Sequence, residues 1–283
     1  MEIRDLEKFI LLAEVENMQI AAQQLDTTPS AISKALKRLE LSIGCSLFQR
    51  IGRHIKLNEQ GRVLLPRAVE ITQNALDVKA MLTGINKQRL TIIGPSILLS
   101  RWASVIARNA NSNLATTEML FDTAYEQKAL NAVLNGNADI GLVTTELINK
   151  LPMNLASTSL GKMDMVVAAG ANNKLIDKRA IYTAELKSQQ FVVPQRSPFC
   201  GEERGKGCDG WHSKLFTRKM PVVVNDFNVT VQLIKSGLYL GYVPSFWARE
   251  HQLNILNVID LPKVEEEVLL ISWQQSLLES LVY

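Results

Sequence analysis

The N-terminal part of the chain alternates apolar and polar positions in three helical patterns, followed by one strand pattern. The apolar positions of the first two predicted helices are Leu6, Phe9, Ile10 and Ala13, then Ala21, Ala22 and Leu25. A third helix is predicted to begin with Thr28 as its N-cap and Pro29 at its first position. Residues 50–57 then alternate like a short hairpin with Gly52 at the tip.

The predicted third helix has two unlike faces. Ile32, Leu36 and Leu39 form an apolar stripe that would pack against the other helices. The opposite stripe, which contains no acid, is Ser30, Ser33, Lys34 and Lys37. Hydroxyls and cations on one face suit contact with DNA, although a solvated helix face would have the same pattern. Helix, helix, tight turn, helix and basic hairpin is the order of an all-α winged helix-turn-helix, expected over residues 1–58.

A longer helix is predicted from Asn58 onward, and Pro66 should bend it near its start. Its apolar positions alternate spacings of four and three: Leu64, Ala68, Ile71, Ala75, Val78, Leu82 and Ile85. So narrow a stripe is typical of a coiled-coil seam that needs a partner helix, so residues 59–88 are expected to form a long dimerisation helix. The alternative is a helix packed on its own domain.

Beyond residue 88, predicted strands alternate with helices, which is typical of an α/β module. The predicted elements are Leu90–Gly94, Ile97–Asn109, Thr116–Phe121, Tyr125–Asn135, Asp139–Thr144, Thr230–Lys235 and Leu240–Pro244. Two further strands, near Lys162–Ala168 and Val264–Trp273, would cross between two similar lobes, and ligands of such folds bind in the cleft between them. The expected boundaries are 89–283 for the module, about 89–161 plus 264–283 for one lobe, and 162–263 for the other.

The charge is concentrated in one block. Residues 27–56 hold six bases and the single acid Glu40, in a chain of net charge +3, and a basic block of this kind suits contact with phosphates. Neither a signal peptide nor a run of about 18 apolar residues is evident, so a cytoplasmic protein with no membrane partner is expected. Three cysteines are too few for a disulfide scaffold.

A long run of N-terminal residues carries a family pattern. It includes Ala21-Ala22-Gln23-Gln24-Leu25, Ser30-Ala31-Ile32-Ser33-Lys34-Ala35-Leu36-Lys37-Arg38-Leu39-Glu40 and Leu57-Asn58-Glu59-Gln60-Gly61. This run closely resembles the LysR-type transcriptional regulators, and later segments are similar at lower specificity. The chain departs from the family at Asn17-Met18, where Gly-Ser is usual, and at Pro29, where glutamine is frequent.

The resemblance implies a DNA-binding regulator with a periplasmic-binding-protein-like α/β sensor module, assembled as a homodimer or homotetramer. The helix that begins at Pro29 would lie in the major groove, and the hairpin would reach the minor groove. The implied DNA contacts are Thr28, Pro29, Ser30, Ser33, Lys34, Lys37, Arg50 and Arg53. A two-fold dimer implies a pseudo-palindromic operator in double-stranded DNA.

The resemblance also implies a small-molecule effector, expected to be an anionic metabolite. Ser96 lies where the family often binds the anion, and free amides at a helix start suit such a group. Alternatively, Ser96 is a plain N-cap serine. The implied effector site is Ser96, Ile97, Thr144, Thr145, Phe199 and Asn225. No cofactor and no metal is expected.

Cys200 and Cys208 flank three glycines and the cations Arg204 and Lys206. Nearby positive charge increases thiol reactivity, and the glycines would let the loop close a disulfide. The placement is similar to that in the peroxide-sensing branch of the family, so a redox-responsive regulator is an alternative to inert cysteines. A zinc site that includes His212 would lack an evident fourth ligand.

An enzyme and a solute-binding protein are the rival classes. The histidines lie in separate segments, and the sequence contains no nucleophile elbow, P-loop or dinucleotide fingerprint, so no enzyme is expected. The helix-turn-helix pattern and the lack of a secretion signal argue against a solute-binding protein. Salt-dependent binding to a DNA duplex would separate a regulator from both classes.

Overall fold

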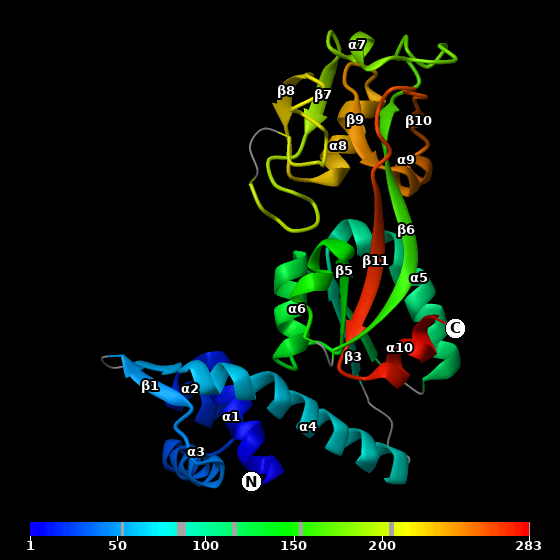
Figure 1. The fold of residues 1–283 in the computed structure, drawn as a ribbon. Coiled ribbons are helices and arrows are strands. Elements are labelled where there is room, and N and C mark those ends of the chain that lie inside the picture. Colours follow the sequence, from blue (N-terminus) through cyan, green and yellow to red (C-terminus); the bar gives the residue numbers. More distant parts are fainter. Residues whose placement is uncertain (52–53, 84–88, 115–117, 153–154, 204–206, 283) are drawn as a thin grey trace.

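The computed structural model describes residues 1–282 apart from 52–53, 84–88, 115–117, 153–154 and 204–206. Figure 1 shows a small N-terminal domain, a long helix and a two-lobed α/β module. The predicted fold class is therefore confirmed.

The N-terminal domain packs three helices and a hairpin around one apolar core. The elements are α1 (Ile3–Val15), α2 (Met18–Gln24), α3 (Pro29–Ile43), β1 (Phe48–Ile51) and β2 (His54–Leu57). The strands β1 and β2 pair antiparallel, as predicted. Phe9 of α1 and Phe48 of the hairpin meet edge to face with ring centroids 5.7 Å apart. This contact and the fully buried Ile32 and Leu39 hold α3 and the hairpin on α1.

Helix α4 (Glu59–Thr83) begins at a side-chain cap and changes its environment along its length. The Oδ1 of Asn58 accepts a hydrogen bond from the Gly61 N–H at 2.8 Å. Ala68 is fully buried in the N-terminal core, whereas Ile71 and Val78 are 38% and 57% exposed. The first turns of the seam thus pack on their own domain, and the later turns offer apolar side chains to a partner. Dimerisation stays a prediction, because the Leu82 side chain and Ile85 lie outside the described residues.

Lobe I contains a parallel sheet in the order β4-β3-β5. Its elements are β3 (Arg89–Gly94), α5 (Ser96–Asn113), β4 (Glu118–Thr123), α6 (Glu126–Leu134), β5 (Ile140–Thr144), the 3₁₀ helix η1 (Thr145–Lys150) and α10 (Gln275–Val282). Helices α5 and α10 cover one face of the sheet, and α6 covers the other. The predicted end of the second strand at Phe121 was wrong, because Asp122 and Thr123 continue the pairing with β3.

Lobe II lies between two long antiparallel strands, β6 (Ala156–Ala169) and β11 (Glu265–Ser272). Its elements are α7 (Thr183–Leu186), β7 (Gln190–Val193), β8 (Lys219–Val223), α8 (Phe227–Lys235), β9 (Gly241–Pro244), α9 (Ser245–Glu250) and β10 (Asn254–Ile255). Strands β9 and β10 pair with β6, so this strand belongs to both lobes. The predicted start of β6 near Lys162 was too late, because its first residues pair with β11 within lobe I.

The strands β6 and β11 shift register at the boundary between the lobes. The shift falls between Val268 and Leu269 on β11, opposite Gly161, which has a φ of 120° that favours glycine. Next to the shift, the Nε1–H of Trp102 donates to the Leu160 carbonyl at 3.3 Å. The Trp102 ring also meets Phe246 of α9 edge to face at 5.5 Å. Two strands, this aromatic contact and a hydrogen bond from the Glu126 N–H to the Phe199 carbonyl at 3.1 Å join the lobes.

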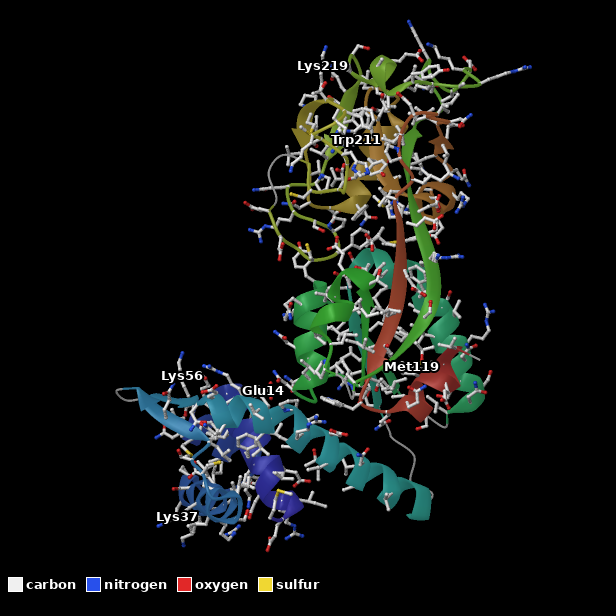
Figure 2. All side chains as sticks on the ribbon, in the orientation of Figure 1. Glu14, Lys37, Lys56, Met119, Trp211 and Lys219 are labelled. Atoms are coloured by element: carbon white, nitrogen blue, oxygen red, sulfur yellow. The ribbon has the colours of Figure 1, made fainter. Side chains whose placement is uncertain are left out.

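Within the described residues, the N-terminal domain and α4 contact lobe I at the end of α6. The Nδ2 of Asn137 donates to Glu14 Oε1 at 3.0 Å, and Figure 2 shows Glu14 on the side of α1 that faces lobe I. Gly136, at φ 75°, lies against Val69 of α4, where an added Cβ would be 3.2 Å from Val69 Cγ1. The end of α6 therefore rests on the N-terminal half of α4.

Candidate DNA-binding surface and effector cleft

Helix α3 begins as its sequence predicts. The Oγ1 of Thr28 accepts a hydrogen bond from the Ala31 N–H at 3.2 Å, and Pro29 occupies the first helical position. This cap satisfies one of the free amides at the helix start and fixes the turn that precedes α3.

The outward stripe of α3 is exposed along its whole length. Ser30, Ser33, Lys34 and Lys37 are all exposed, opposite the buried residues Ile32, Leu36 and Leu39. Figure 2 shows Lys37 at the outer edge of the domain. The stripe is therefore open to solvent and carries the two cations Lys34 and Lys37.

Arg38 differs from the other bases of α3, because it holds the helix on α1. Its Nη2 and Nε donate to the buried Asp5 carboxylate at 2.6 and 3.2 Å. The hydrogen bond and the charge of Asp5 raise the pKa of Arg38 above its ordinary value. The basic block of the sequence thus includes one guanidinium that is already paired with a carboxylate.

The hairpin supplies the remaining predicted DNA contacts. Glu40 Oε1 accepts from the Leu47 N–H at 2.7 Å, which holds the end of α3 against the start of the hairpin. The Arg50 backbone lies in β1, but its side chain is outside the described residues, as is the whole of Arg53. Both stay predictions.

Two adjoining cavities lie between the lobes. The smaller, of about 80 Å³, is bordered by Ser96 and Tyr125 from lobe I and by Asn225 and Tyr242 from lobe II. The larger, of about 720 Å³, has the following residues in its wall: Thr144, Glu146, Phe199, Cys208, Trp211, His212, Lys214 and Glu266. Met165 and Asp209 border both cavities, so the two lie next to each other, and we call them together the interlobe cleft.

The predicted effector residues divide between these cavities. Ser96 and Asn225 border the smaller one, and Thr144 and Phe199 border the larger one. Ile97 is 2% exposed and packs in the core, and Thr145 borders neither cavity. Pro95 is the N-cap of α5 and Ser96 is its first residue. The interpretation of Ser96 as an N-cap is therefore wrong, and its exposed side chain lies on the first helical turn.

A buried ion pair supports the lobe II side of the cleft. The guanidinium of Arg218 donates to both carboxylate oxygens of Asp209, at 2.6 and 2.8 Å. Both side chains are nearly inaccessible, at 1% and 2% exposure. Arg218 also stacks over Phe191 and Trp211, with its Cζ 5.1 and 4.9 Å from the ring centroids. Figure 2 shows Trp211 in the interior of lobe II.

Two carboxylates, Glu146 and Glu266, border the larger cavity, and Glu126 is buried beside Thr144, which also borders it. We call Glu126, Glu146 and Glu266 the acidic wall. Glu126 is fully buried, and its Oε1 accepts from the Thr144 N–H at 2.8 Å. Burial raises the pKa of Glu126, and burial together with the charge of Glu146 raises the pKa of Glu266. Lys214 faces this cavity from lobe II.

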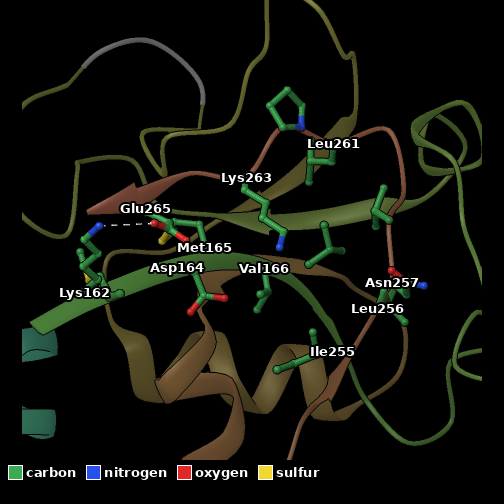
Figure 3. A pocket seen from close by; sticks show the side chains of 14 residues that line it. Lys162, Asp164, Met165, Val166, Ile255, Leu256, Asn257, Leu261, Lys263 and Glu265 are labelled. Carbon is green, nitrogen blue, oxygen red and sulfur yellow. Dashed lines mark ion pairs between the residues drawn. The ribbon is translucent and has the colours of Figure 1, made fainter. Parts of the chain in front are cut away.

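A third cavity, of about 370 Å³, lies over β6 beside β10 and the start of β11 (Figure 3). Lys162 and Glu265 form an ion pair at its edge, with Nζ and Oε2 3.9 Å apart. None of the predicted effector residues borders it.

The family follows from comparison with known proteins. The model "Bacterial regulatory helix-turn-helix protein, lysR family" matches residues 3–62, and "LysR substrate binding domain" matches residues 85–282. The chain belongs to the LysR family. It is a DNA-binding transcriptional regulator with an effector-binding domain, and the family consists of regulators rather than enzymes.

Relatives of this LysR-type regulator match along most of its length. CitR of Bacillus subtilis is 26% identical over 260 residues, which cover 86% of this chain and 82% of CitR. Full-length LysG from Corynebacterium glutamicum, with the effector Arg bound, has a TM-score of 0.66 and 20% identity, covering 100% of this chain and 96% of LysG. CbnR in complex with its target DNA has a TM-score of 0.53 and 19% identity, covering 100% and 98%. The two structures share the fold of this regulator.

The cysteines of the regulator lie in different surroundings. Cys208 is buried, its Sγ donates to the Gln195 carbonyl at 3.1 Å, and it borders the larger cavity. Cys200 is half-buried on the same loop, and Cys45 packs against the N-terminal core. All three are thiols. Within the described part of the chain, no cluster of His, Cys, Asp or Glu suits a metal ion, and no helix is long and apolar enough to cross a bilayer.

The sequence did not indicate three features in or beside the cleft: the Asp209–Arg218 pair, the acidic wall and the buried hydroxyl of Tyr242. Asp209 and Arg218 are only nine positions apart, but their burial depends on packing against Phe191. The acidic wall and the surroundings of Tyr242 join residues that are far apart in the sequence. The single signal that could have pointed to one of them was the tyrosine within an otherwise apolar strand, at Tyr242.

Proposed function

We propose that this regulator binds a pseudo-palindromic duplex as a homodimer, and that a small carboxylate-bearing effector in the interlobe cleft controls this binding. The observation that carries the effector class is the position of Ser96. It is exposed on the first turn of the 18-residue helix α5, at the border of the smaller cavity. The first turn of α5 contains no acid. A hydroxyl and free amides at the positive end of a long helix favour an anion.

The relatives support the same class. LysG was solved with Arg, which carries a carboxylate, as its effector. Arg196 of lobe II also borders the smaller cavity. The carboxylate end of the effector would thus face a helix start and a cation, and the remainder of the molecule would extend into the larger cavity. The proposed contacts are Ser96, Thr144, Phe199 and Asn225.

The proposed DNA contacts are the exposed stripe of α3 and the basic hairpin. Ser30, Ser33 and Lys34 would face base edges, while Lys37 and the hairpin bases would hold phosphates. CbnR was solved with its target DNA, which supports the same use of this fold. The exposed apolar residues Ile71, Leu76 and Val78 of α4 support a dimer through this helix. A homotetramer would add a second such dimer.

The test uses the full chain and five probes: acetate, succinate, citrate, benzoate and L-arginine. We expect at least one probe to raise the Tm and to change the affinity for an operator duplex, with a strong dependence on salt. Ser96→Ala should lower the affinity for that probe about tenfold. Ser100→Ala is the control, because Ser100 lies on α5 and donates only to the Ile97 carbonyl of its own helix at 2.9 Å. Equal responses of the two variants would reject Ser96 as an effector contact.

The redox alternative rests on Cys208, which borders the cleft on the same loop as Cys200. Gly201 and Gly207, at φ 75° and 78°, supply turns on this loop that other residues rarely adopt. In this mechanism peroxide oxidises both thiols to one disulfide and is itself reduced to two waters. Peptide mapping after mild peroxide separates the alternatives. A rapid Cys200–Cys208 linkage favours redox sensing, and persistent thiols favour the carboxylate.

A further inference from the structure

The hydroxyl of Tyr242 is an unusual group in the cleft. Tyr242 lies on β9, is 3% exposed and borders the smaller cavity together with Ser96 and Asn225. Its ring packs edge to face against Trp211, with centroids 5.2 Å apart at 85°. Among the residues that the structure describes, its hydroxyl oxygen is buried and has no hydrogen-bond partner.

An unpaired buried hydroxyl is unfavourable to the folded protein. It loses its hydrogen bonds to water on folding and gains none in return. Phenylalanine would fill the same space against Trp211 without this loss. Buried polar groups in native proteins are nearly always paired, so an exception at the border of a cavity points to a group that arrives from outside. The hydroxyl is thus matched to a bound molecule rather than to the packing of lobe II.

The charges around Tyr242 favour a hydrogen-bond donor. Burial, and then the charge of Asp209, raises the pKa of Tyr242 to about 12. The phenol therefore keeps its proton at neutral pH. Both Asp209 oxygens are engaged by Arg218, and Asp226 caps α8 by accepting from Asn228 N–H at 2.7 Å. The acceptor that the Tyr242 hydroxyl lacks would thus come from the ligand.

We propose that Tyr242 is an effector-binding residue whose hydroxyl donates to one oxygen of the effector carboxylate, while Ser96 and the α5 amides bind the other oxygen. This inference rests on the carboxylate effector proposed above and names the second half of its recognition. The small volume of the smaller cavity, about 80 Å³, suits a carboxylate group rather than a whole metabolite. Ser96 belongs to lobe I and Tyr242 to lobe II, so one carboxylate would link the two lobes across the cleft.

The experiment compares Tyr242→Phe with Tyr239→Phe in the full chain. Tyr239 is half-buried near β9 and borders neither cavity of the cleft. Thermal unfolding is measured without ligand and with the same five probes. Without ligand, Tyr242→Phe should unfold at the same temperature as the wild type or higher, because it removes an unpaired hydroxyl. With the active probe, its affinity should fall about ten- to a hundredfold, since a hydrogen bond to a charged group is lost.

A second measurement separates a binding role from a structural one. Operator affinity without probe should be unchanged in Tyr242→Phe, and the probe-induced change in that affinity should be lost. A lower Tm without ligand together with a normal probe response would overturn the inference, because the hydroxyl would then have a structural partner. If Ser96→Ala loses the response and Tyr242→Phe keeps it, this inference fails and the proposed function stands. If no probe affects the wild type, both fail.

Discussion

The two recognition surfaces of this regulator are built in opposite ways. The proposed DNA-binding stripe of α3 is convex and exposed, and its four residues fall within eight consecutive positions, Ser30 to Lys37. The effector cleft is concave, and its walls come from segments as distant as Ser96 and Tyr242. The stripe needs only a helix held at the right angle, whereas the cleft needs two lobes, the strands that join them and the buried Asp209–Arg218 pair. Damage to packing should therefore disturb effector recognition before it disturbs DNA recognition.

The largest effect is expected at the buried ion pair. Arg218→Ala would leave Asp209 charged and unpaired inside lobe II, which should destabilise the fold by about 3–5 kcal/mol. Calorimetry on the full chain tests this, with Lys219→Ala, an exposed neighbour, as the control. The variant should lose probe binding, while operator binding persists below its lowered Tm. If Arg218→Ala unfolded at the same temperature as Lys219→Ala, the Asp209–Arg218 pair would contribute little to the stability of the fold.

The second largest effect is expected in α4. Val78→Glu places a charge in the exposed apolar seam, so dimers should dissociate and operator affinity should fall about a hundredfold through loss of bivalent binding. Sedimentation velocity and DNA titration measure the two effects. Asn74→Glu, exposed but outside the seam, is the control. An intact dimer in Val78→Glu would exclude the seam as the interface.

A smaller effect is expected on the α3 stripe, where two lysines one turn apart have different roles. Lys34→Ala should cost about 1–3 kcal/mol of affinity for the operator and relax its base preference. Lys37→Ala should weaken all duplexes alike and reduce the salt dependence by about one counterion. Binding-site selection and salt titration distinguish these results. Unchanged binding by both variants would remove this face from the DNA interface.

The smallest effect concerns the acidic wall. Because burial raises the pKa of Glu126, the folded protein binds its proton more tightly than the unfolded chain does. This contribution to stability is complete below the ordinary pKa of 4.5 and is lost as the pH rises through the raised value. Glu126→Gln should therefore raise the Tm by a few degrees at neutral pH and have little effect below pH 4.5. The exposed control Glu250→Gln should not change this profile, and a lower Tm for Glu126→Gln at neutral pH would contradict the prediction.

The difference between the two surfaces also explains what the sequence could predict. The cap at Thr28, the buried stripe and the exposed stripe follow from local periodicity, so α3 was predictable residue by residue. Arg38 was not distinguishable from the other bases, because its partner Asp5 lies 33 positions away. In the cleft, the pattern and family resemblance indicated Ser96 and Thr144 but not the Asp209–Arg218 pair. Its burial depends on the packing of Phe191 and Trp211, which no local pattern encodes.

The path of the chain through the α/β module has a consequence for how new effector specificities can evolve. Every element from α7 to β10 lies between β6 and β11 in the sequence, and the two strands meet where the Met165 N–H donates to the Val264 carbonyl at 3.0 Å. Lobe II is thus one continuous segment of the chain, and its two ends lie next to each other. One recombination event could replace the wall that carries Tyr242 and keep α6 and its contact with α4. New chemical specificities could then be acquired by exchanging one segment, without changing the lobe that contacts α4.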